Sequence, residues 1–391
     1  MRIAFVITNA PPLIGGLEKI CLRLAQQMKS LGHEVKIITR FSKERHSLSG
    51  YFRDSEGGGT FENEGIPTTV LPLTTTSRIL LLPVFKMIWR QWTFPLARWL
   101  YVTAIRGSLK SAIESADIIH FYGNGPEMLG FAAKYVAYEL SSKFVVEPAL
   151  HEGQWGDGWI DNELYSEADL LLAHTHFEGT ILSEMGLAKE KIKVITHGVD
   201  CGEQGDANRF RELNQVRGPI VLFLGRKTKE KGVLRLIHAW PSVLLKHPDA
   251  TLVLAGSGHA KDLHELPPST LDLDNLSEES KQDALAACDL LCVPSEGESF
   301  GMVYFEAWAY KKPVIAINLS VMQETIGASH GGILVKPDPP SVASAINTLL
   351  SDPMMRTMMG EAGRLFAKRY AWAQAVESYL HAYQSICLQG L

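Results

Sequence analysis

The stretch Cys292–Val314, CVPSEGESFGMVYFEAWAYKKPV, joins three local patterns. An apolar, strand-like run leads into a turn of Ser, Glu and Gly, and a helix-like run follows the turn. A strand, a turn and a helix in this order form the unit from which parallel sheets are built. Two carboxylates, Glu298 and Glu306, lie in this stretch with seven residues between them. They could be a catalytic pair, or they could hold a ligand while other groups react.

The separation of Glu298 and Glu306 argues against an acid/base pair. If both residues were helical, the α-helical rise would place them roughly 12 Å apart. A retaining glycosidase pair needs only about 5 Å, and an inverting pair up to about 9.5 Å. The spacing instead fits two carboxylates that hold different hydroxyls of one long ligand. For either glutamate alone, a solvated surface position is the simpler interpretation.

The strand–turn–helix order occurs twice along the chain. Residues 2–8 (RIAFVIT), a helical run over residues 17–32 and residues 33–39 (HEVKIIT) form a β–α–β unit. The pattern restarts at Pro219 with PIVLFLG, a helix and the strand ATLVLAGSG. Continuous apolar strands of this kind are buried on both faces of a parallel sheet. The sequence therefore predicts an α/β fold of two doubly wound, Rossmann-like domains that face a cleft at the carboxyl ends of their strands.

This repeat also sets the expected domain boundaries. The polar, glycine-containing segment Gly198–Gly218 is interpreted as the linker, and both amphipathic helices near Pro353–Tyr370 and Ala371–Leu388 are candidates to brace the first domain. The predicted parts are an N-terminal domain over 1–200, a C-terminal domain over 201–370, and a helix over 371–391 that packs back on the N-terminal domain.

Length and composition place the chain among globular proteins. Of its 391 residues, 46% are hydrophobic and 21% charged, which suits two domains and not a disordered chain. The five cysteines form no CxxC pair and the chain opens on a strand without a signal peptide, so we expect a cytoplasmic protein. Residues 1–110 carry 15 Lys and Arg against 7 Asp and Glu. This basic end suggests a membrane surface or an anionic partner, and a solvated basic face would explain it equally well.

The turn before the helix is suited to a diphosphate. The first helical N–H groups, around Phe300–Val303, lack partners within the helix, and together with the helix dipole they attract anions. Gly301 permits a close backbone approach. An ordinary N-cap by Ser299 would explain the same residues. At the same sheet edge, Arg226 and Lys231 in FLGRKTKEKG would neutralise a pyrophosphate leaving group, unless they belong to a solvated basic loop.

Glycines and a histidine mark two loops of the N-terminal half. Gly15 and Gly16 lie in the first β–α turn, which is not GxGxxG and so does not favour NAD binding. They would let backbone amides touch a phosphate or sugar, or simply form a tight turn. His151 follows the strand KFVVEPAL and starts a Gly- and Trp-rich loop that could position a sugar or acceptor. A lone histidine, like His120 at another strand end, is more often structural.

The apolar segment Ser77–Gly107 is rich in Trp and Phe, and four cations and two prolines interrupt it. This composition makes a membrane-spanning helix a poor interpretation. It fits a helix that lies in a bilayer interface. It also fits a pair of amphipathic helices packed on the N-terminal sheet, with the cations reaching out to water.

Taken together, these elements resemble the retaining GT-B glycosyltransferases of family 4, the glycosyl transferases group 1. The run from Glu298 through Ser-Phe-Gly to Glu306 resembles the E-x7-E signature of that family. The other matching stretches, in chain order, are PPLIGGLEK, EKIKVITHGVD, FLGRKTKEKG, LVLAGSG and GGILVKP. The match extends along nearly the whole chain, and the order and spacing of its elements are more specific than any one of them.

The resemblance implies a role for each matching residue. It implies an acceptor-binding domain over 1–200 and a nucleotide-sugar-binding domain over 201–370. Glu306 would hold the ribose, and Glu298 with the amides of Ser299, Phe300 and Gly301 would contact the donor sugar. The diphosphate would be bound by the amides near Met302 and Val303 together with Arg226 and Lys231.

The remaining roles concern the base, the acceptor and the transferred sugar. Asn275 and Leu276 fall where such enzymes contact the base. Gly15 and Gly16 would approach the phosphate or the acceptor from the opposite domain, and His151 would lie near the transferred sugar. The residues placed closest to the chemistry are thus His151, Glu298, Arg226 and Lys231. The family transfers with retention and without a metal, by a front-face substitution in which the leaving phosphate helps to deprotonate the acceptor.

The chain departs from the family pattern after the signature helix. The family commonly has Gly before the following Pro-Val, whereas this chain has Lys311-Lys312-Pro313. The next loop often carries a Gly-Gly turn, and here it is NLSVMQE, Asn318–Glu324. Because this loop tends to line the donor pocket in the family, the departure bears on which donor is bound.

The sequence therefore predicts a metal-independent retaining glycosyltransferase that uses a UDP- or GDP-linked sugar and a saccharide or glycolipid acceptor. It predicts no cofactor and no nucleic-acid partner. His174 and His176 have no acidic third ligand at a recognisable spacing, so it predicts no metal site. Contact with the inner face of a membrane through residues 77–107 is one of two interpretations. The alternative functions are a GT-B phosphorylase or epimerase, and a catalytically silent nucleotide-sugar-binding subunit.

Overall fold

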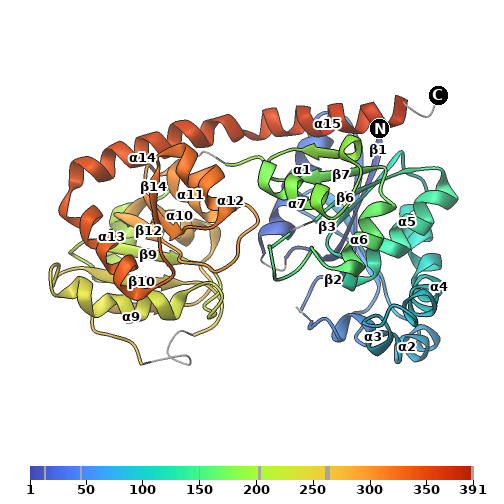
Figure 1. The fold of residues 1–391 in the computed structure, drawn as a ribbon, viewed down its shortest axis with the longest axis horizontal. Helices are drawn as coiled ribbons and strands as arrows, with labels where there is room; N and C mark the ends of the chain where they lie inside the picture. The colour runs from blue at the N-terminus through green and yellow to red at the C-terminus, as the bar shows by residue number, and fades with distance from the viewer. Residues whose placement is uncertain (13–14, 45, 149, 201–203, 260–264, 389–391) are drawn as a thin grey trace. The chain divides into compact units, whose positions relative to one another are not determined.

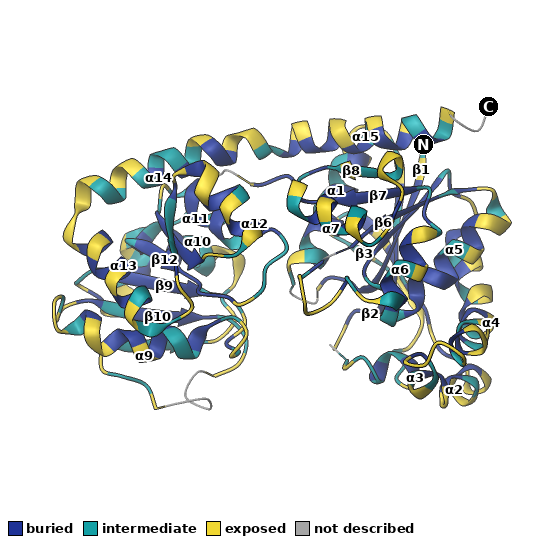
Figure 2. Ribbon diagram, in the orientation of Figure 1, coloured by how far each residue is buried: buried dark blue, intermediate teal, exposed yellow. Residues whose placement is uncertain are grey.

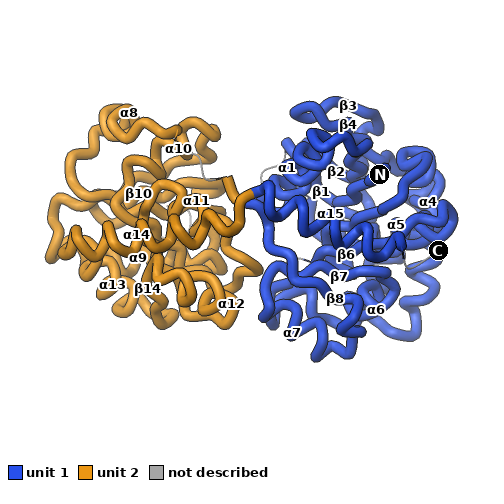
Figure 3. Tube along the Cα trace, turned by 90° about the horizontal axis from the view of Figure 1, so that it is seen from above, with its two compact units in different colours: residues 1–198, 372–391 blue, residues 199–371 orange. Residues whose placement is uncertain are grey.

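The computed structural model describes residues 1–12, 15–44, 46–148, 150–200, 204–259 and 265–388. These residues form two compact units, which Figure 3 shows in different colours. Unit 1 consists of residues 1–198 and 372–391, and unit 2 of residues 199–371. The chain therefore passes from one unit to the other twice.

Unit 1 is built on an eight-stranded sheet in the order β3-β4-β2-β1-β5-β6-β7-β8. All neighbouring strands run parallel except β3 and β4, which are antiparallel. The central strands are buried along their length, as the continuous apolar runs predict. The strands are β1 (Arg2–Asn9), β2 (Glu34–Phe41), β3 (Gly59–Asn63), β4 (Ile66–Val70), β5 (Ile118–Tyr122), β6 (Lys143–Glu147), β7 (Leu170–Ala173) and β8 (Ile192–Val194).

Helices cover both faces of this sheet (Figure 1). The α-helices of unit 1 are α1 (Gly16–Ser30), α2 (Thr75–Leu81), α3 (Val84–Met87), α4 (Phe94–Ile113), α5 (Leu129–Leu140), α6 (Trp159–Ser166), α7 (His176–Glu184) and α15 (Trp372–Leu388). Short 3₁₀ helices are η1 (Gly50–Phe52), η2 (Gly125–Glu127) and η3 (Lys189–Lys191). The helix α15 packs on α1, so the chain end returns to the first unit as predicted.

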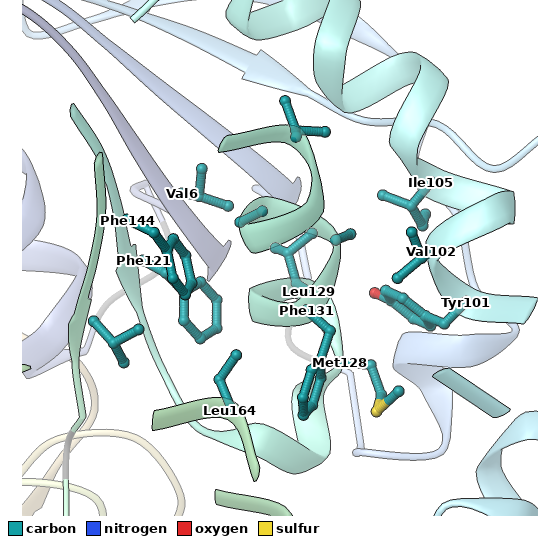
Figure 4. Close-up of a cluster of buried hydrophobic side chains, with 14 of the residues drawn as sticks. Val6, Tyr101, Val102, Ile105, Phe121, Met128, Leu129, Phe131, Phe144 and Leu164 are labelled. Carbon is teal, nitrogen blue, oxygen red and sulfur yellow. The ribbon is translucent and has the colours of Figure 1, made fainter. Parts of the chain in front are cut away.

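The main hydrophobic core of unit 1 lies between the sheet and α4 and α5 (Figure 4). Val6, Phe121 and Phe144 point into it from neighbouring strands, and Phe131 and Tyr101 meet them from the helices. Because successive strand residues point to opposite faces, the residues between these apolar side chains belong to the other face of the sheet, the one that α1 and α15 cover. That second face contains the polar cluster described below.

The segment 77–107 forms α2, α3 and most of α4, and it packs on the core with one face only. Its buried side chains include Leu81, Ile88 and Tyr101. Pro83 precedes α3 and Pro95 lies in the first turn of α4, so both prolines stand where a missing N–H is tolerated. Among the described residues, we find no helix that is both long and apolar enough to cross a membrane.

Unit 2 contains a six-stranded, fully parallel sheet in the order β11-β10-β9-β12-β13-β14. Its strands are β9 (Ile220–Leu224), β10 (Thr251–Ala255), β11 (Thr270–Leu273), β12 (Leu290–Cys292), β13 (Val314–Ile317) and β14 (Gly332–Val335). Its helices are α8 (Ala207–Leu213), α9 (Val233–Leu244), α10 (Glu278–Ala287), α11 (Met302–Ala309), α12 (Ser320–Met322), the π-helix η5 (Gln323–Gly327), α13 (Pro339–Ser351), α14 (Pro353–Ala367) and η6 (Lys368–Tyr370). The predicted GT-B architecture of two Rossmann-like folds is confirmed.

One expectation about the connections was wrong. The predicted linker Gly198–Gly218 contains α8, which is tied to α10 because Arg209 binds the Asp283 carboxylate through Nε at 2.5 Å and Nη2 at 2.8 Å. The polar composition of this segment concealed the helix, because only Phe210 is buried on it. Of the two C-terminal helices, α14 stays in unit 2 and packs on α11, and only α15 belongs to unit 1.

Candidate functional site

The sheet of unit 2 has a topological switch point between β9 and β12. From β9 the chain moves outward through β10 to β11, and it then returns to β12 and continues to β14 on the other side. In open α/β sheets, ligands bind at the carboxyl ends of the strands where the order reverses. The two loops at this point are residues 225–232 and 293–301, and they contain Arg226, Lys231 and Glu298.

A backbone hydrogen bond and an arginine side chain from α9 hold these two loops against each other. The amide of Glu296 donates to the carbonyl of Glu230 at 2.8 Å, and Nη1 of Arg235 donates to the carbonyl of Pro294 at 2.7 Å. Gly232 makes this approach possible: its φ is +79°, and a Cβ there would lie 2.0 Å from the Pro294 oxygen. The glycine at the end of FLGRKTKEKG is therefore required by the contact between the loops.

Lys231 and Glu298 meet across this junction. The Lys231 Nζ lies 2.6 Å from Glu298 Oε1, and the side chains retain exposed fractions of 22% and 11%. The pair joins residues 67 positions apart in sequence, and the separate motifs did not reveal it. Glu298 Oε2 and the remaining protons of the ammonium group give the pair further capacity for hydroxyl and phosphate groups.

The N-terminus of α11 is capped by glycine. The helix begins at Met302, its N-cap is Gly301 with φ 80° and ψ 49°, and no side chain caps it. The alternative of an ordinary N-cap by Ser299 is therefore wrong. A Cβ on Gly301 would lie 2.5 Å from Cδ2 of Tyr304, so only glycine fits at this left-handed cap position.

The side chain of Phe300 does not contribute to the surface of this loop. It is 2% exposed and stacks on Phe305 with a centroid distance of 4.6 Å. Only its backbone can therefore reach a ligand. Met302 and Val303 begin the helix half-buried, and their N–H groups belong to the first turn, which has no intrahelical acceptors.

Glu306 is the fifth residue of α11, whereas Glu298 lies in the preceding loop. The two are not on one helix, so the 12 Å estimate from helical rise does not describe them. Glu306 Oε1 accepts from Nζ of Lys281 on α10 at 2.9 Å, and Lys281 also pairs with Glu278 at 2.9 Å. Each signature glutamate thus contacts its own lysine.

The cations of the β9 loop have different environments. The Arg226 guanidinium is exposed and has no ion-pair partner within the part of the chain that the structure describes. Lys227 is 3% exposed, and its Nζ lies 2.7 Å from Asp272 and 2.5 Å from the carbonyl of Leu273. Lys227 therefore fastens the loop to β11, and Arg226 projects away from it. The sequence alone did not separate the two.

Asn275 and Leu276 follow β11 at the same carboxyl edge of the sheet. Asn275 is exposed and Leu276 is half-buried, and Ser277 after them caps α10 by accepting from the Ser280 amide at 3.1 Å. Their backbone is therefore fixed between a strand and a capped helix.

Unit 1 has its own switch point, between β1 and β5. Gly15 is the N-cap of α1 and Gly16 its first residue, at the carboxyl end of β1; their neighbours 13–14 lie outside the described residues. A Cβ on Gly16 would meet nothing within 4 Å, so packing within the protein does not require a glycine there. On the other side of this switch point lies Glu127, which sequence reasoning missed. Thr8 donates to this carboxylate, and burial raises the pKa of Glu127 to about 7.

His151 follows β6, one strand away from that switch point. It forms a small antiparallel bridge with Trp155, with His151 N donating to the Trp155 carbonyl at 2.9 Å and the rings 4.1 Å apart. The imidazole is half-buried and Trp155 is exposed, so the loop presents an aromatic pair at its surface. The motif HEGQW therefore closes a tight loop.

These features define a class of protein with two Rossmann-like units. One unit has a glycine-capped helix start, cations and carboxylates at its switch point. Comparisons with known proteins agree. The model of Glycosyltransferase Family 4 matches residues 14–203, and that of Glycosyl transferases group 1 matches residues 205–366. The chain belongs to this family, which is a family of retaining glycosyltransferases.

Individual relatives are distant. A phosphatidyl-myo-inositol mannosyltransferase of Mycobacterium tuberculosis is 30% identical over 207 residues, which is 50% of this chain and 54% of that protein. An uncharacterized glycosyltransferase of Methanocaldococcus jannaschii is 24% identical over 98% of both chains. Among solved structures, Anabaena HepE in complex with UDP and glucose has a TM-score of 0.75 over 98% of this chain and 100% of that chain, at 19% identity. The match thus spans about half of the mannosyltransferase, and the likeness to HepE is one of fold.

Proposed function

We propose that this protein transfers a hexosyl group, with retention, from a UDP- or GDP-linked sugar to a saccharide or glycolipid acceptor, in the synthesis of a cell-surface polysaccharide or glycolipid. The observation that carries the proposal is the junction of Lys231 and Glu298 at the switch point of unit 2, beside the glycine-capped start of α11. This junction combines anion-binding and hydroxyl-binding groups over one sheet edge, which is what a sugar diphosphate requires.

We assign each part of the donor (base, ribose, diphosphate and sugar) to residues of unit 2. Asn275 and Leu276 contact the base, and Glu306 accepts from the ribose hydroxyls. The amides at the start of α11 (Met302 and Val303) bind the diphosphate with Arg226 and Lys231. Glu298 and the backbone of Ser299–Gly301 hold the sugar hydroxyls.

The chemistry is a substitution at the anomeric carbon. The bond from this carbon to the β-phosphate oxygen breaks, and the bond to the acceptor oxygen forms on the same face. The acceptor proton passes to the leaving phosphate, so no carboxylate nucleophile is needed. Arg226 and Lys231 stabilise the negative charge that develops on the diphosphate. In unit 1, we assign His151 to the transferred sugar and Gly15 and Gly16 to the phosphate or acceptor.

A binding and turnover panel tests this proposal. UDP, GDP and their hexose conjugates are titrated into the protein, and donor hydrolysis is measured in parallel. Glu306→Gln should weaken nucleotide binding by about 10–100-fold, because a charged hydrogen bond contributes about 1.5–3 kcal/mol. Glu298→Gln should reduce turnover more than it reduces binding of the free nucleotide, because the only part of the donor assigned to Glu298 is the sugar; loss of its pair with Lys231 accounts for any smaller effect on the diphosphate. Glu361→Gln, a surface glutamate of the same unit paired with Lys311, is the control.

Other outcomes identify the alternatives. No binding of any nucleotide or nucleotide sugar at millimolar concentration would exclude the proposal. Phosphate-dependent breakdown of an oligosaccharide would identify a phosphorylase, and conversion of the donor into its epimer would identify an epimerase. Binding without turnover in the presence of candidate acceptors would identify a silent subunit.

We further propose that α2–α4 contact an anionic bilayer surface, which fits a glycolipid acceptor. The segment from α2 to α4 exposes Ile79, Trp92, Leu96 and Trp99 by 53–76% of their surface, and Figure 2 shows the exposed parts of these helices in yellow. Lys86 and Arg90 are exposed on the same segment. Large apolar side chains next to cations are typical of helices that lie in the headgroup region.

Not every cation of the segment is available to lipid. Arg98 forms an ion pair with Glu167 and lies 4.9 Å from the centre of the Phe131 ring. Arg106 donates to the hydroxyl of Tyr135 at 3.0 Å. These two arginines therefore hold α4 on the unit.

Vesicle co-sedimentation with and without anionic lipid tests the surface. The double variant Lys86→Glu/Arg90→Glu should reduce binding to anionic vesicles, and Trp92→Ser/Trp99→Ser should reduce binding to both kinds. Leu245→Ser, which removes an 87% exposed leucine from unit 2, serves as the control. Equal binding of all four proteins would rule out this surface.

A further inference from the structure

Four polar side chains come together on the second face of the unit 1 sheet. His120 lies within β5, Glu147 ends β6, His174 follows β7 and His197 follows β8. All four are between 0% and 2% exposed. Because these strands are parallel neighbours, their carboxyl ends place the four residues beside one another. Their sequence positions give no metal-ligand spacing.

The geometry centres on the carboxylate of Glu147. Its Oε1 lies 3.9 Å from Nδ1 of His174 and 3.6 Å from Nδ1 of His197. One ligand atom from each of the three residues can be chosen so that all lie within 4.8 Å of one another. Three ligands about 2.1 Å from a zinc ion at tetrahedral angles would be roughly 3.4 Å apart. The two measured distances exceed this separation by a few tenths of an ångström and the third pair lies within 4.8 Å, so the three side chains would have to move closer together around an ion.

The other carboxylate oxygen already has partners. Glu147 Oε2 accepts from the hydroxyl of Tyr379 at 2.9 Å, and it lies 3.2 Å from Nε2 of His120. The Nδ1 of His120 in turn lies 2.6 Å from the hydroxyl of Tyr383. Both tyrosines belong to α15. These outer contacts orient the carboxylate so that Oε1 points toward His174 and His197.

The Glu147 Oε1 atom is buried. Within the described part of the chain, Glu147 Oε1 has no hydrogen-bond partner. Buried polar atoms nearly always have partners, and a buried carboxylate is stable when a cation compensates it.

We propose that Glu147, His174 and His197 bind one divalent transition-metal ion, zinc in the first instance, as a structural site. Two imidazoles and a carboxylate are a ligand set suited to Zn²⁺. Each imidazole comes from a different strand end, so the ion would join β6, β7 and β8. Tyr379 of α15 donates to the Glu147 carboxylate, so the metal would also stabilise the packing of the C-terminal helix.

The site is distinct from the proposed donor site and has no part in sugar transfer. It belongs to unit 1, its ligands are closed from solvent, and no substrate could reach them. We therefore expect the metal to stabilise unit 1 and not to react. The test below does not depend on transferase activity.

Metal analysis of the untagged protein tests the proposal. After growth in zinc-supplemented medium and desalting, the protein should contain about one zinc per chain by mass spectrometry. Removal by a chelator should lower the melting temperature, and added Zn²⁺ should restore it, because a ligand that binds only the folded state stabilises it. Crystals should show an anomalous peak at the zinc edge between Glu147, His174 and His197.

Variants locate the ion. His174→Gln should abolish zinc retention, and His176→Gln, which changes an exposed histidine two residues away, should keep one zinc per chain. Tyr379→Phe removes an outer-shell contact and should weaken zinc binding by about 10–100-fold. If His174→Gln does not fold, the stoichiometry and the anomalous peak of the unaltered protein decide.

The opposite results are equally clear. No retained metal, together with no change in melting temperature on adding Zn²⁺, Fe²⁺ or Co²⁺, would show that the cluster is a metal-free polar core. Loss of zinc in His176→Gln to the same extent as in His174→Gln would place the ion elsewhere. Either result overturns the proposal.

Discussion

Replacement of Gly232 by alanine tests how the two loops of the unit 2 switch point are held together. Gly232 has φ +79°, and an added Cβ would lie 2.0 Å from the carbonyl oxygen of Pro294. A left-handed conformation costs an L-residue roughly 1–2 kcal/mol. The collision is with backbone, so the loops must separate, and overpacking of this kind costs about 1–3 kcal/mol. The two effects together destabilise unit 2 by about 2–5 kcal/mol.

The separation should also break specific contacts. The same carbonyl accepts from Nη1 of Arg235 at 2.7 Å, and Lys231 directly precedes Gly232. A shift of the loop therefore weakens the Arg235 hydrogen bond and moves Lys231 away from Glu298. The first effect adds to the loss of stability, and the second changes the candidate site.

Calorimetry of the intact protein measures the effect. For a unit of this size, a melting temperature falls by roughly 2–4 °C per kcal/mol, so Gly232→Ala should lower the transition of unit 2 by at least ~4 °C. Gly258→Ala is the matched control: its φ is +87°, but its Cβ would meet only Lys227, whose oxygen and Cβ lie at ordinary distances of 3.6 and 3.8 Å. It has the backbone strain without the collision. If Gly232→Ala is no less stable than Gly258→Ala, the reasoning from the loop contact is wrong.

Three further predictions concern stability. Lys311, just after α11, has a φ of 57°, a conformation that glycine adopts at lower cost. Lys311→Gly should therefore raise the free energy of unfolding by up to ~1 kcal/mol, even though the exposed ion pair with Glu361 is lost. Lys312→Gly should not raise it, and urea unfolding compares the two variants. Burial raises the pKa of Glu127 to about 7 in the folded state, so between pH 5 and 7 the folded state binds more protons than the unfolded state. The free energy of unfolding therefore falls as the pH rises, by at most ~1.4 kcal/mol per pH unit for this group. Glu127→Gln should flatten this pH dependence, and an unchanged slope would contradict the prediction. Tyr304→Phe removes the hydroxyl that donates to the Val293 carbonyl at 2.7 Å, whereas the Ser295 amide still donates to this carbonyl at 2.8 Å. The loss of one hydrogen bond should cost about 0.5–1.5 kcal/mol in urea unfolding, and equal stability would contradict this.

The departure from the family pattern at Lys311 has a structural explanation. A helix commonly ends with a glycine in the left-handed conformation just past its last turn, and Lys311 occupies that position after α11. Its amide donates to Trp308 O at 2.9 Å, and its carbonyl lies so close to Gly360 that a Cβ there would be only 1.9 Å away. The backbone shape is thus kept without the glycine. The sequence showed the exchange, but not that tertiary packing preserves the turn.

Local patterns were sufficient for the elements of the candidate site. Arg226, Lys231 and Glu298 each follow an apolar strand, and parallel strands place their carboxyl ends at one sheet edge. What the patterns could not show was partner choice. Lys227 and Arg226 are adjacent and equally basic in sequence, yet one is buried against Asp272 and the other is exposed. Burial depends on β11, which is more than forty residues away, and no local rule carries that information.

The sequence by itself determined the two parallel α/β units, the family and the strand-end positions of most candidate residues, because hydrophobic periodicity and turn chemistry act over a few residues. Tertiary structure decided which charges meet. It paired Glu298 with Lys231 and Glu306 with Lys281, and it gathered Glu147 with three histidines from other strands. Such pairs arise only when strand order brings distant segments within a few ångströms, and strand order is a property of the whole sheet.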